Sequence, residues 1–386
     1  MKRTITIGLV ALAVALVLAT SLCMVACNKN CDKGSCTPAL GATAIEHETK
    51  FGGVYIKITI DDFNALGFAF GDSLNITFSN GFELLDLPYF NGFYVDMGEP
   101  LLVGYPGYPY IRAGYNNGAD MFVTAELADT DTATVTLAAK GKYLDVQESL
   151  DIHYSDVQGD KSDAEFANFR AANVGNLKDN ILYRSASPVD NQHNRAAIAD
   201  RLASQAGVGF ILNLSDDEEE LAAHIAAEDF DSPYARALFE QGKIVALSMN
   251  MAFKSEGFSQ KLVNGLTAAS QNEGPYLVHC VEGKDRTGFV CMVMEALAGA
   301  TYQEIIDDYM ITYYNYYGID QNTEPTKYRI IKEKYIEVML HYITGDGDVD
   351  ITTADYAYYA RQYLRGIGMS EDAVDALTAN LVNPQE

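Results

Sequence analysis

The chain has no tryptophan, few histidines and few basic residues. Lys and Arg together number 27 against 53 Asp and Glu, so the formal net charge is −26 at pH 7. A chain with this balance offers no evident basic face, and nucleic acid is therefore not expected as a partner. The 6 histidines and 6 cysteines show no metal-ligand spacing, so we predict neither a metal site nor a cofactor. The 386 residues exceed one average domain, and 25 tyrosines and 17 phenylalanines supply material for two cores.

An apolar run over residues 5–22 follows Lys2 and Arg3, a pattern typical of a signal peptide. The run leads into Met24-Val25-Ala26-Cys27, which resembles a bacterial lipobox. The resemblance implies a lipoprotein signal in residues 1–27, a lipid on Cys27, and a protein anchored to the outer face of the cytoplasmic membrane. The alternative is a retained transmembrane anchor, because the run is near the lower length limit for a span. Residues 28–50 are expected to be a linker, in which Cys31 and Cys36 either pair or stay free.

Residues 51–154 are predicted to form a small all-β domain, either a barrel or a sandwich. Residues 54–60 and 74–78 alternate apolar and polar side chains, as half-buried strands do. Turn signals such as Asn91-Gly92 separate the strand patterns. No long helical pattern interrupts them.

Residues 165–384 are predicted to form an α/β domain with a mostly parallel central sheet flanked by helices. Strand patterns at 207–214, 244–249 and 276–278 alternate with helical patterns, one of them over 258–269. Such alternation favours parallel strands joined by helices. The polar stretch 155–164 is expected to link the two domains.

The most informative stretch is His279 to Gly288, which reads His-Cys-Val-Glu-Gly-Lys-Asp-Arg-Thr-Gly. It lies between an apolar strand pattern and an apolar helix pattern, so it is predicted to be a loop at a helix N-terminus. Free N–H groups and the helix dipole make such a loop an anion site. The same field favours the thiolate of Cys280, and the planar fork of Arg286 suits two phosphate oxygens. This combination favours phosphoryl transfer to sulfur and then to water.

The stretch resembles the signature of the cysteine-dependent tyrosine phosphatases, His-Cys-x5-Arg-[Ser/Thr]. With Gly-Lys-Asp inside the loop it looks like a bacterial subfamily of tyrosine and phosphoinositide phosphatases, whose other motifs residues 168–170 and 182–188 resemble. The sequence departs from the subfamily at Ala171, where Asp is usual, and at residues 213–215, where Asp-Leu-Arg is usual. Arg170 and Arg184 are expected to be structural ion-pair partners near the pocket rather than phosphate ligands.

The resemblance and the loop chemistry together assign roles to the loop residues. Cys280 is predicted to be the nucleophile and Arg286 to bind the phosphoryl oxygens as charge spreads over them. Thr287 is predicted to donate its hydroxyl to the sulfur as the sulfur leaves the cysteinyl-phosphate intermediate. His279 is expected to orient the loop through backbone contacts. Substrate binding is assigned to the surrounding residues of the loop, namely His279, Val281, Glu282, Gly283 and Lys284.

The leaving oxygen needs a proton donor, and Asp285 is predicted to be this general acid and then the base for water. The loop over 250–257 lacks the Asp that most tyrosine phosphatases carry on a separate loop, so Glu256 and Asp216 are the alternatives. Lys284 either adds a second cation that suits phosphoinositide headgroups or is a solvated lysine at the rim.

The pattern as a whole predicts a phosphomonoester hydrolase, in the first place a protein-tyrosine phosphatase with dual specificity as an option. Its partner is then a phosphorylated protein. One alternative is a phosphoinositide or inositol-phosphate phosphatase. The other is a catalytically weak phosphoryl-binding module at the cell surface, which the altered motifs favour and the intact Cys280, Arg286 and Thr287 oppose.

Overall fold

The computed structural model describes residues 37–345 and 347–383, which form two compact units. The described part of the first unit comprises residues up to 90, 100–114 and 119–142, and the second comprises 91–99, 115–118 and 143 onward. The predicted signal peptide, Cys27, Cys31 and Cys36 lie outside the described residues. Among the residues that are described, no helix combines the length and apolar character needed to cross a membrane.

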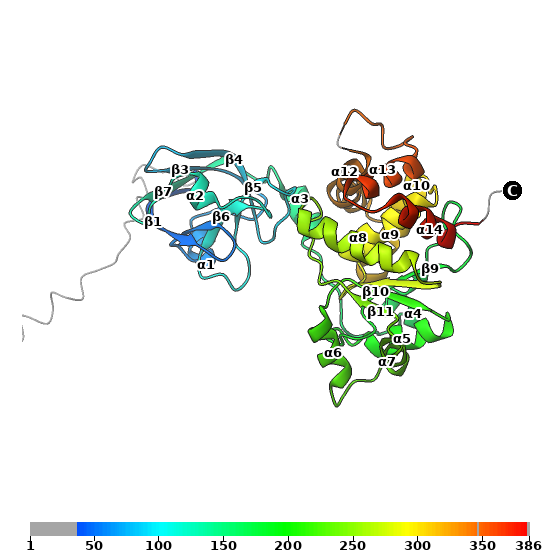
Figure 1. Cartoon of the computed structure of the whole chain (residues 1–386). Coiled ribbons are helices and arrows are strands. Elements are labelled where there is room, and N and C mark those ends of the chain that lie inside the picture. Colours follow the sequence, from blue (N-terminus) through cyan, green and yellow to red (C-terminus); the bar gives the residue numbers. More distant parts are fainter. Residues whose placement is uncertain (1–36, 346, 384–386) are drawn as a thin grey trace, which may run out of the picture. The chain divides into compact units, whose positions relative to one another are not determined.

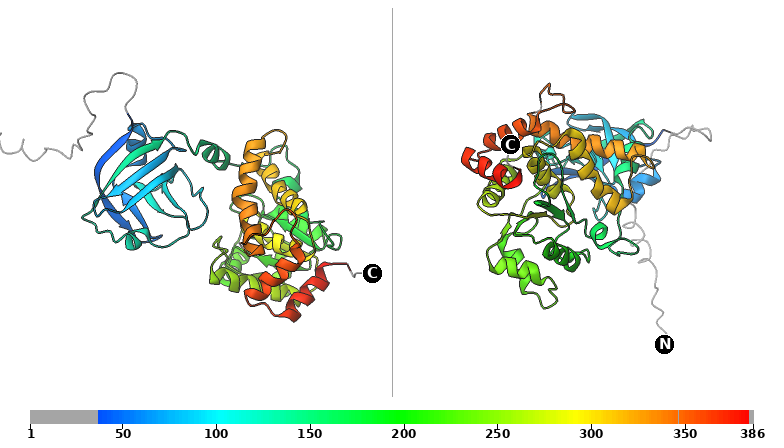
Figure 2. Two further views of the ribbon diagram at one scale, coloured as in Figure 1. Left: turned by 90° about the horizontal axis from the view of Figure 1, so that it is seen from above. Right: turned by 90° about the vertical axis from the view of Figure 1, so that its right-hand side faces the viewer.

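The first unit is a closed β-barrel with the strand order β1-β2-β6-β5-β4-β3-β7. Figure 2 (left) shows its strands wrapping into a closed wall. Buried side chains such as Val54, Ile76 and Phe78 fill the interior, because successive strand residues face opposite sides of the wall. The predicted all-β domain is confirmed as a barrel. Its elements are β1 (Ala39–Glu48), β2 (Gly53–Ile56), α1 (Ile60–Ala65), β3 (Ser73–Phe78), β4 (Glu83–Phe90), β5 (Pro100–Val103), β6 (Ile111–Tyr115), α2 (Met121–Thr124) and β7 (Thr132–Ala139).

Strand β1 corrects the predicted linker, because it lies inside the range 28–50. Most of its side chains are exposed or half-buried, and Ile45 is its one buried apolar residue. The strand therefore carries little of the alternation that identifies a strand in a sequence. Its position is fixed by antiparallel pairing with both β2 and β7, which closes the barrel.

The second unit contains a five-stranded sheet in the order β11-β10-β12-β9-β8. Strands β9 to β12 are parallel, and only β8 pairs antiparallel among them. This confirms the predicted mostly parallel sheet. The strands are β8 (Arg170–Ala171), β9 (Leu182–Ser185), β10 (Phe210–Asn213), β11 (Ile244–Ala246) and β12 (Tyr276–His279).

Helices cover both faces of this sheet, as Figure 1 shows for α8 and α9 on one face and α5 to α7 on the other. In β12, Tyr276 and Val278 belong to the large core that α8 and α9 share, whereas Leu277 packs in the smaller core on the opposite face. Helix α9 is buried on all sides from Thr287 to Leu297, which its apolar sequence requires. The helices of this unit are α3 (Leu144–Leu150), α4 (Asp163–Phe166), α5 (Ala196–Gln205), α6 (Glu218–Ala226), α7 (Pro233–Glu240), α8 (Glu256–Ser270), α9 (Asp285–Leu297), α10 (Tyr302–Tyr317), α11 (Pro325–Ile331), the π-helix η1 (Lys332–Ile336), α12 (Glu337–Thr344), α13 (Tyr356–Gly366) and α14 (Glu371–Leu381).

The stretch 155–164, expected to be a linker, is instead bound to the second unit. The carboxylate of Asp156 lies 3.0 Å from both Arg195 Nη1 and His193 Nδ1. Lys161 donates to the backbone carbonyls of Asn315 and Tyr316 in α10. The polar residues that made this stretch look solvated are therefore used in contacts with distant parts of the domain.

The carboxyl ends of the four parallel strands meet in one row at one edge of the sheet. His279 at the end of β12 pairs with Asn213 of β10 and Ser185 of β9, and Asn213 also pairs with Ala246 of β11. Ligands of open parallel sheets bind at this edge. The predicted phosphate loop follows His279 directly.

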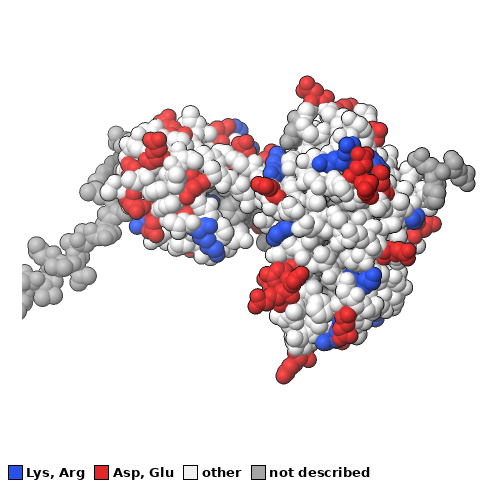
Figure 3. Space-filling view, in the orientation of Figure 1, with Lys and Arg blue, Asp and Glu red and all other residues white. Residues whose placement is uncertain are grey.

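The charge imbalance of the sequence is visible on the surface. Figure 3 shows acidic groups over the face in view, one of them over α6. That helix opens with Glu218, Glu219 and Glu220, where carboxylates suit the positive end of the helix dipole.

Candidate active site

The loop between β12 and α9 makes its tightest turn at Gly283. This residue has φ +67°, and a Cβ there would lie 2.1 Å from the carbonyl oxygen of Ser185. Both facts require glycine, because other residues are strained at positive φ and any side chain would meet the end of β9. The predicted curl at Gly283 is thus what the structure contains.

The first two carbonyl groups of the loop are held from outside it. The carbonyl oxygen of Val281 accepts from the backbone N–H of Ser187 at 3.1 Å. The carbonyl oxygen of Glu282 accepts from the hydroxyl of Tyr316 at 2.6 Å. A trans peptide places its N–H opposite its carbonyl, so the N–H groups of Glu282 and Gly283 point away from these two anchors.

The next two carbonyl groups are held by polar side chains from other strands and loops. The carbonyl oxygen of Gly283 accepts from Asn168 Nδ2 at 3.1 Å and from Arg184 Nη2 at 3.2 Å. The carbonyl oxygen of Lys284 accepts from the same Arg184 nitrogen at 3.3 Å. By the same geometry, the N–H groups of Lys284 and Asp285 point away from Arg184.

The N–H groups of the loop are left available by this arrangement. Among the described residues, those of Glu282, Gly283, Lys284 and Asp285 have no hydrogen-bond acceptor. They lie at the N-terminus of α9, where the helix dipole adds partial positive charge. Buried N–H groups of this kind form a cradle for an anion.

Arg184 is itself fixed by a buried ion-pair cluster. Its guanidinium is 1% exposed and lies 2.6 Å from Asp308 Oδ2, while Arg170 Nε lies 2.9 Å from Asp308 Oδ1. Burial opposes the charged form of Asp308, but the two guanidinium groups outweigh it and lower the pKa to about 2. The predicted role of Arg170 and Arg184 as structural ion-pair partners agrees with this arrangement.

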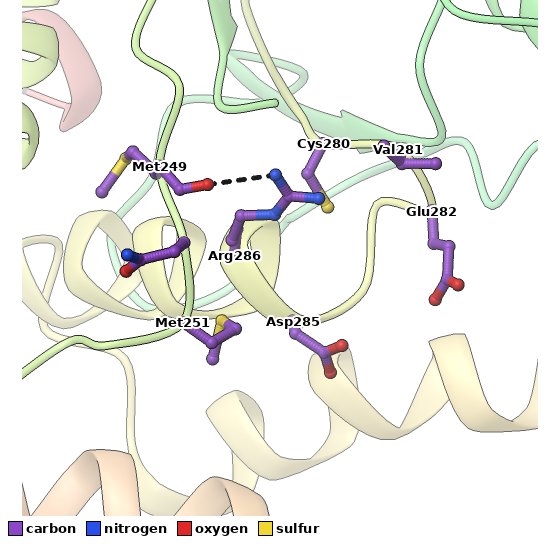
Figure 4. Close-up of a pocket in the computed structure, with 8 residues that line it drawn as sticks. Met249, Met251, Cys280, Val281, Glu282, Asp285 and Arg286 are labelled. Atoms are coloured by element: carbon purple, nitrogen blue, oxygen red, sulfur yellow. Dashed lines mark hydrogen bonds between the residues drawn. The ribbon is translucent and has the colours of Figure 1, made fainter. Parts of the chain in front are cut away.

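A cavity of about 360 Å³ opens beside the loop and is bordered by Cys280, Asp285 and Arg286. Figure 4 shows the sulfur of Cys280 beside the guanidinium of Arg286. Arg286 Nη1 donates to the carbonyl oxygen of Met249 at 3.1 Å, which holds the guanidinium at the cavity. Cys280 is 3% exposed, so a reactant reaches the sulfur only through this cavity. The lining residues are Met249, Asn250, Met251, Cys280, Val281, Glu282, Asp285 and Arg286.

These features agree with a match of residues 165–383 to the tyrosine phosphatase family, which covers more than half of the sequence. The chain belongs to the tyrosine phosphatase family. No curated protein sequence matches the chain significantly.

Two solved phosphatase structures give an independent similarity. A crystal structure of Pseudomonas aeruginosa TpbA with phosphotyrosine is 17% identical, covering 44% of this chain and 92% of that chain at a TM-score of 0.25. The core catalytic domain of the PP-IP phosphatase SIW14 from Saccharomyces cerevisiae, with citrate, is 18% identical, covering 46% and 92% at a TM-score of 0.26. Because these likenesses are low, the family is assigned from the match of residues 165–383.

Of the candidate acids in this tyrosine phosphatase, only Asp285 lines the cavity. Glu256 lies in the first turn of α8 and does not border the cavity. Asp216 is buried, where it accepts from Asn213 Nδ2 at 2.8 Å, and burial raises its pKa. The geometry therefore favours Asp285 among the three.

His279 and Thr287 lie deeper than the cavity wall. His279 is fully buried with Nδ1 3.4 Å from the carbonyl oxygen of Cys280, and burial lowers its pKa to about 3. It is therefore neutral at pH 7 and contacts the loop backbone, as expected. The Thr287 hydroxyl is buried and has no hydrogen-bond partner among the described residues, so a hydrogen bond to the sulfur is not formed in this structure.

Lys284 is placed differently from a cavity cation. Its ammonium lies 3.3 Å from the Tyr317 hydroxyl and 5.9 Å from the centre of the Tyr313 ring. Burial opposes its charged form, but the carboxylate of Asp285 leads the groups that outweigh burial, and the pKa is raised well above the ordinary value. Lys284 is thus charged but turned toward the aromatic side chains of α10.

Three contributors to the site carry no signal in the sequence. Met249 and Met251 form one wall of the cavity, although the sequence drew attention to their loop only for its lack of Asp. Tyr154 donates to Glu282 Oε1 at 2.7 Å across 128 positions of the chain. No spacing rule connects residues so far apart, so only the folded chain reveals them. Among the described residues no cluster of His, Cys, Asp and Glu is suited to a metal.

Proposed function

We propose that this protein hydrolyses phosphomonoesters as a cysteine-dependent protein-tyrosine phosphatase. The observation that carries the proposal is the anchored loop, whose carbonyl groups are all turned toward Ser187, Tyr316, Asn168 and Arg184 while its N–H groups stay free. An anion bound there lies between the sulfur of Cys280 and the guanidinium of Arg286. Fixed donors of this kind stabilise charge that develops on the phosphoryl oxygens.

The reaction has two steps. In the first, the Cys280 sulfur forms a bond to phosphorus, the bond from phosphorus to the leaving oxygen breaks, and Asp285 gives that oxygen a proton. In the second, Asp285 takes a proton from water, the water oxygen bonds to phosphorus, and the sulfur leaves as thiolate. Arg286 binds phosphoryl oxygens in both steps. The Thr287 hydroxyl, unpartnered in this structure, is the donor assigned to the departing sulfur.

Turnover of a phosphotyrosine peptide beside a phosphatidylinositol phosphate tests the proposal. We expect hydrolysis of the peptide, and a loss of at least about 10³-fold in kcat for Cys280→Ser. Cys291→Ser is the matched control, because Cys291 is the other cysteine in the described part of the chain and is buried in α9 away from the cavity. Rapid acid quench with phosphorus-labelled peptide should leave label on the wild-type chain only. Turnover that persists in Cys280→Ser would overturn the proposal, and turnover of neither substrate by the wild-type chain would favour a phosphoryl-binding module.

We further propose that the enzyme is tethered at the cell surface through a lipid on Cys27. The support is the sequence pattern alone, namely the apolar run 5–22 and the residues Met24-Val25-Ala26-Cys27. Metabolic labelling with a fatty acid should mark the wild-type chain and not Cys27→Ala. A Cys27→Ala chain that remains in the membrane at the unprocessed mass would instead support a retained transmembrane anchor.

A further inference from the structure

The charged groups that border the active-site cavity are mostly acidic. Glu282 and Asp285 contribute carboxylates to its wall, and Arg286 contributes the one guanidinium. Figure 4 shows both carboxylates apart from the Cys280 sulfur, on the side of the loop toward the rim. Once Arg286 is engaged by the reacting phosphate, the remaining charged side chains of the wall are negative.

Lys284 does not cancel this charge. Its ammonium lies 3.5 Å from Glu282 Oε2 and 3.6 Å from Asp285 Oδ2, so a single cation is shared by two carboxylates. Its side chain is 17% exposed and does not border the cavity. The group that would have attracted a second phosphate is therefore withdrawn, and the rim keeps a net negative charge.

Glu282 is held at both ends by tyrosines. Its backbone carbonyl accepts from Tyr316, and its carboxylate accepts from the Tyr154 hydroxyl at 2.7 Å. The Tyr154 ring stacks on the Tyr316 ring at 4.8 Å, and the Arg195 guanidinium lies 4.9 Å from the Tyr154 ring. Burial, with Glu282 beside it, raises the pKa of Tyr154, so the phenol stays a donor. A carboxylate fixed in this way cannot swing aside for an anionic substrate group.

We propose that Glu282, positioned by Tyr154, makes the active site select phosphotyrosine next to lysine or arginine and disfavour esters with further phosphates. This inference rests on the proposed phosphatase activity. A cation within a Debye length of the rim is attracted by its carboxylates, and a second phosphate there is repelled. Glu282 is thus a specificity-determining residue, and Tyr154 is a positioning residue that acts through it.

The test compares kcat/KM of the full-length protein for three peptides that differ only in the residues beside phosphotyrosine, which are lysine, alanine or glutamate. We expect the lysine peptide to exceed the glutamate peptide by about fivefold at low salt, and the ratio to shrink as salt screens the charges. Inositol hexakisphosphate should be turned over more slowly than the alanine peptide. Equal kcat/KM for the peptides, or faster turnover of the inositol polyphosphate, overturns the inference while the phosphatase activity stands.

Two variants separate charge selection from a structural effect. Tyr154→Phe keeps the stacked ring and removes only the hydroxyl, so the lysine-to-glutamate ratio should fall toward one while turnover of p-nitrophenyl phosphate stays within about twofold. Glu282→Gln should lower the same ratio. Tyr314→Phe, at an exposed position of α10, is the matched control and should keep the wild-type ratio. A ratio unchanged in both Tyr154→Phe and Glu282→Gln overturns the inference. A wild-type chain that hydrolyses no phosphate ester removes the proposed function and the inference with it.

Discussion

Arg184 donates to the carbonyl oxygen of Gly283 at 3.2 Å, across 99 positions of the chain. This contact turns the peptide that follows Gly283, so that the next N–H group points away from the arginine. Because Arg184 also pairs with Asp308 at 2.6 Å, the orientation of the phosphate loop depends on a buried charge cluster that never touches the cavity. The catalytic loop of this tyrosine phosphatase is therefore built from two layers, and each layer is open to mutation.

Arg184→Lys should lower both activity and stability. Lysine keeps the charge but cannot reach Asp308 and the carbonyl oxygens of Gly283 and Lys284 together, since it lacks the planar fork. We expect kcat for p-nitrophenyl phosphate to fall about 10²-fold and the free energy of unfolding to fall by about 1–3 kcal/mol. Arg201→Lys, at a side chain 49% exposed beside Asp163, should leave both quantities unchanged within error. Wild-type kcat in Arg184→Lys would separate the buried cluster from the loop.

Gly283→Ala should abolish activity. The added Cβ would lie 2.1 Å from the carbonyl oxygen of Ser185, and φ is +67°, so the loop must move or strain by about 1–3 kcal/mol. Gly257→Ala is the matched control, because a Cβ there meets nothing within 4 Å. In the first turn of α8, alanine should be neutral or stabilising by up to about 1 kcal/mol. Circular dichroism and urea unfolding give the stabilities, and full activity in Gly283→Ala would contradict the described turn.

Asp285→Asn should slow the enzyme most when the leaving group is a poor one. An amide cannot donate a carboxylic proton, so turnover of phosphotyrosine should fall about 10²–10⁴-fold, whereas p-nitrophenyl phosphate, whose leaving oxygen needs little protonation, should lose less. Glu256→Gln and Asp216→Asn test the alternatives, neither of which borders the cavity. An equal loss with both substrates, or a larger loss in either control, would move the acid role away from Asp285.

Glu295→Gln should change how stability depends on pH. Glu295 is buried beside Asp308, and burial followed by the Asp308 charge raises its pKa well above the ordinary 4.5. A group with a raised pKa stabilises the fold fully below its unfolded pKa, and that contribution is lost as pH rises. The wild-type chain therefore loses up to about 1.4 kcal/mol per pH unit from this group above pH 4.5, and the glutamine variant does not.

Urea unfolding of both chains at pH 5, 6 and 7 measures this effect. The difference in unfolding free energy between Glu295→Gln and wild type should grow in favour of the variant as pH rises. A difference that stays constant over this range would mean that Glu295 titrates alike in the folded and unfolded chains.

The sequence by itself determined the chemistry of the loop and the class of both domains. The order of residues from His279 to Gly288 places a thiol, a glycine turn and a guanidinium at a helix start, and these depend only on neighbours along the chain. Strand and helix periodicities are local in the same way. They predicted the β domain and the mostly parallel sheet, and their failure at β1 has the same origin, because that strand is defined by its partners and not by its own pattern.

Only the tertiary structure decided which way the loop faces and what surrounds its mouth. Arg184, Asn168 and Tyr316 hold the loop carbonyls from positions far along the chain. Lys284 turns to the tyrosines of α10, and Tyr154 fixes Glu282 from a stretch whose polarity predicted a linker. Hydrogen bonds of this kind exist only once packing has brought distant residues within about 3 Å of each other. No periodicity or motif in the sequence records those distances.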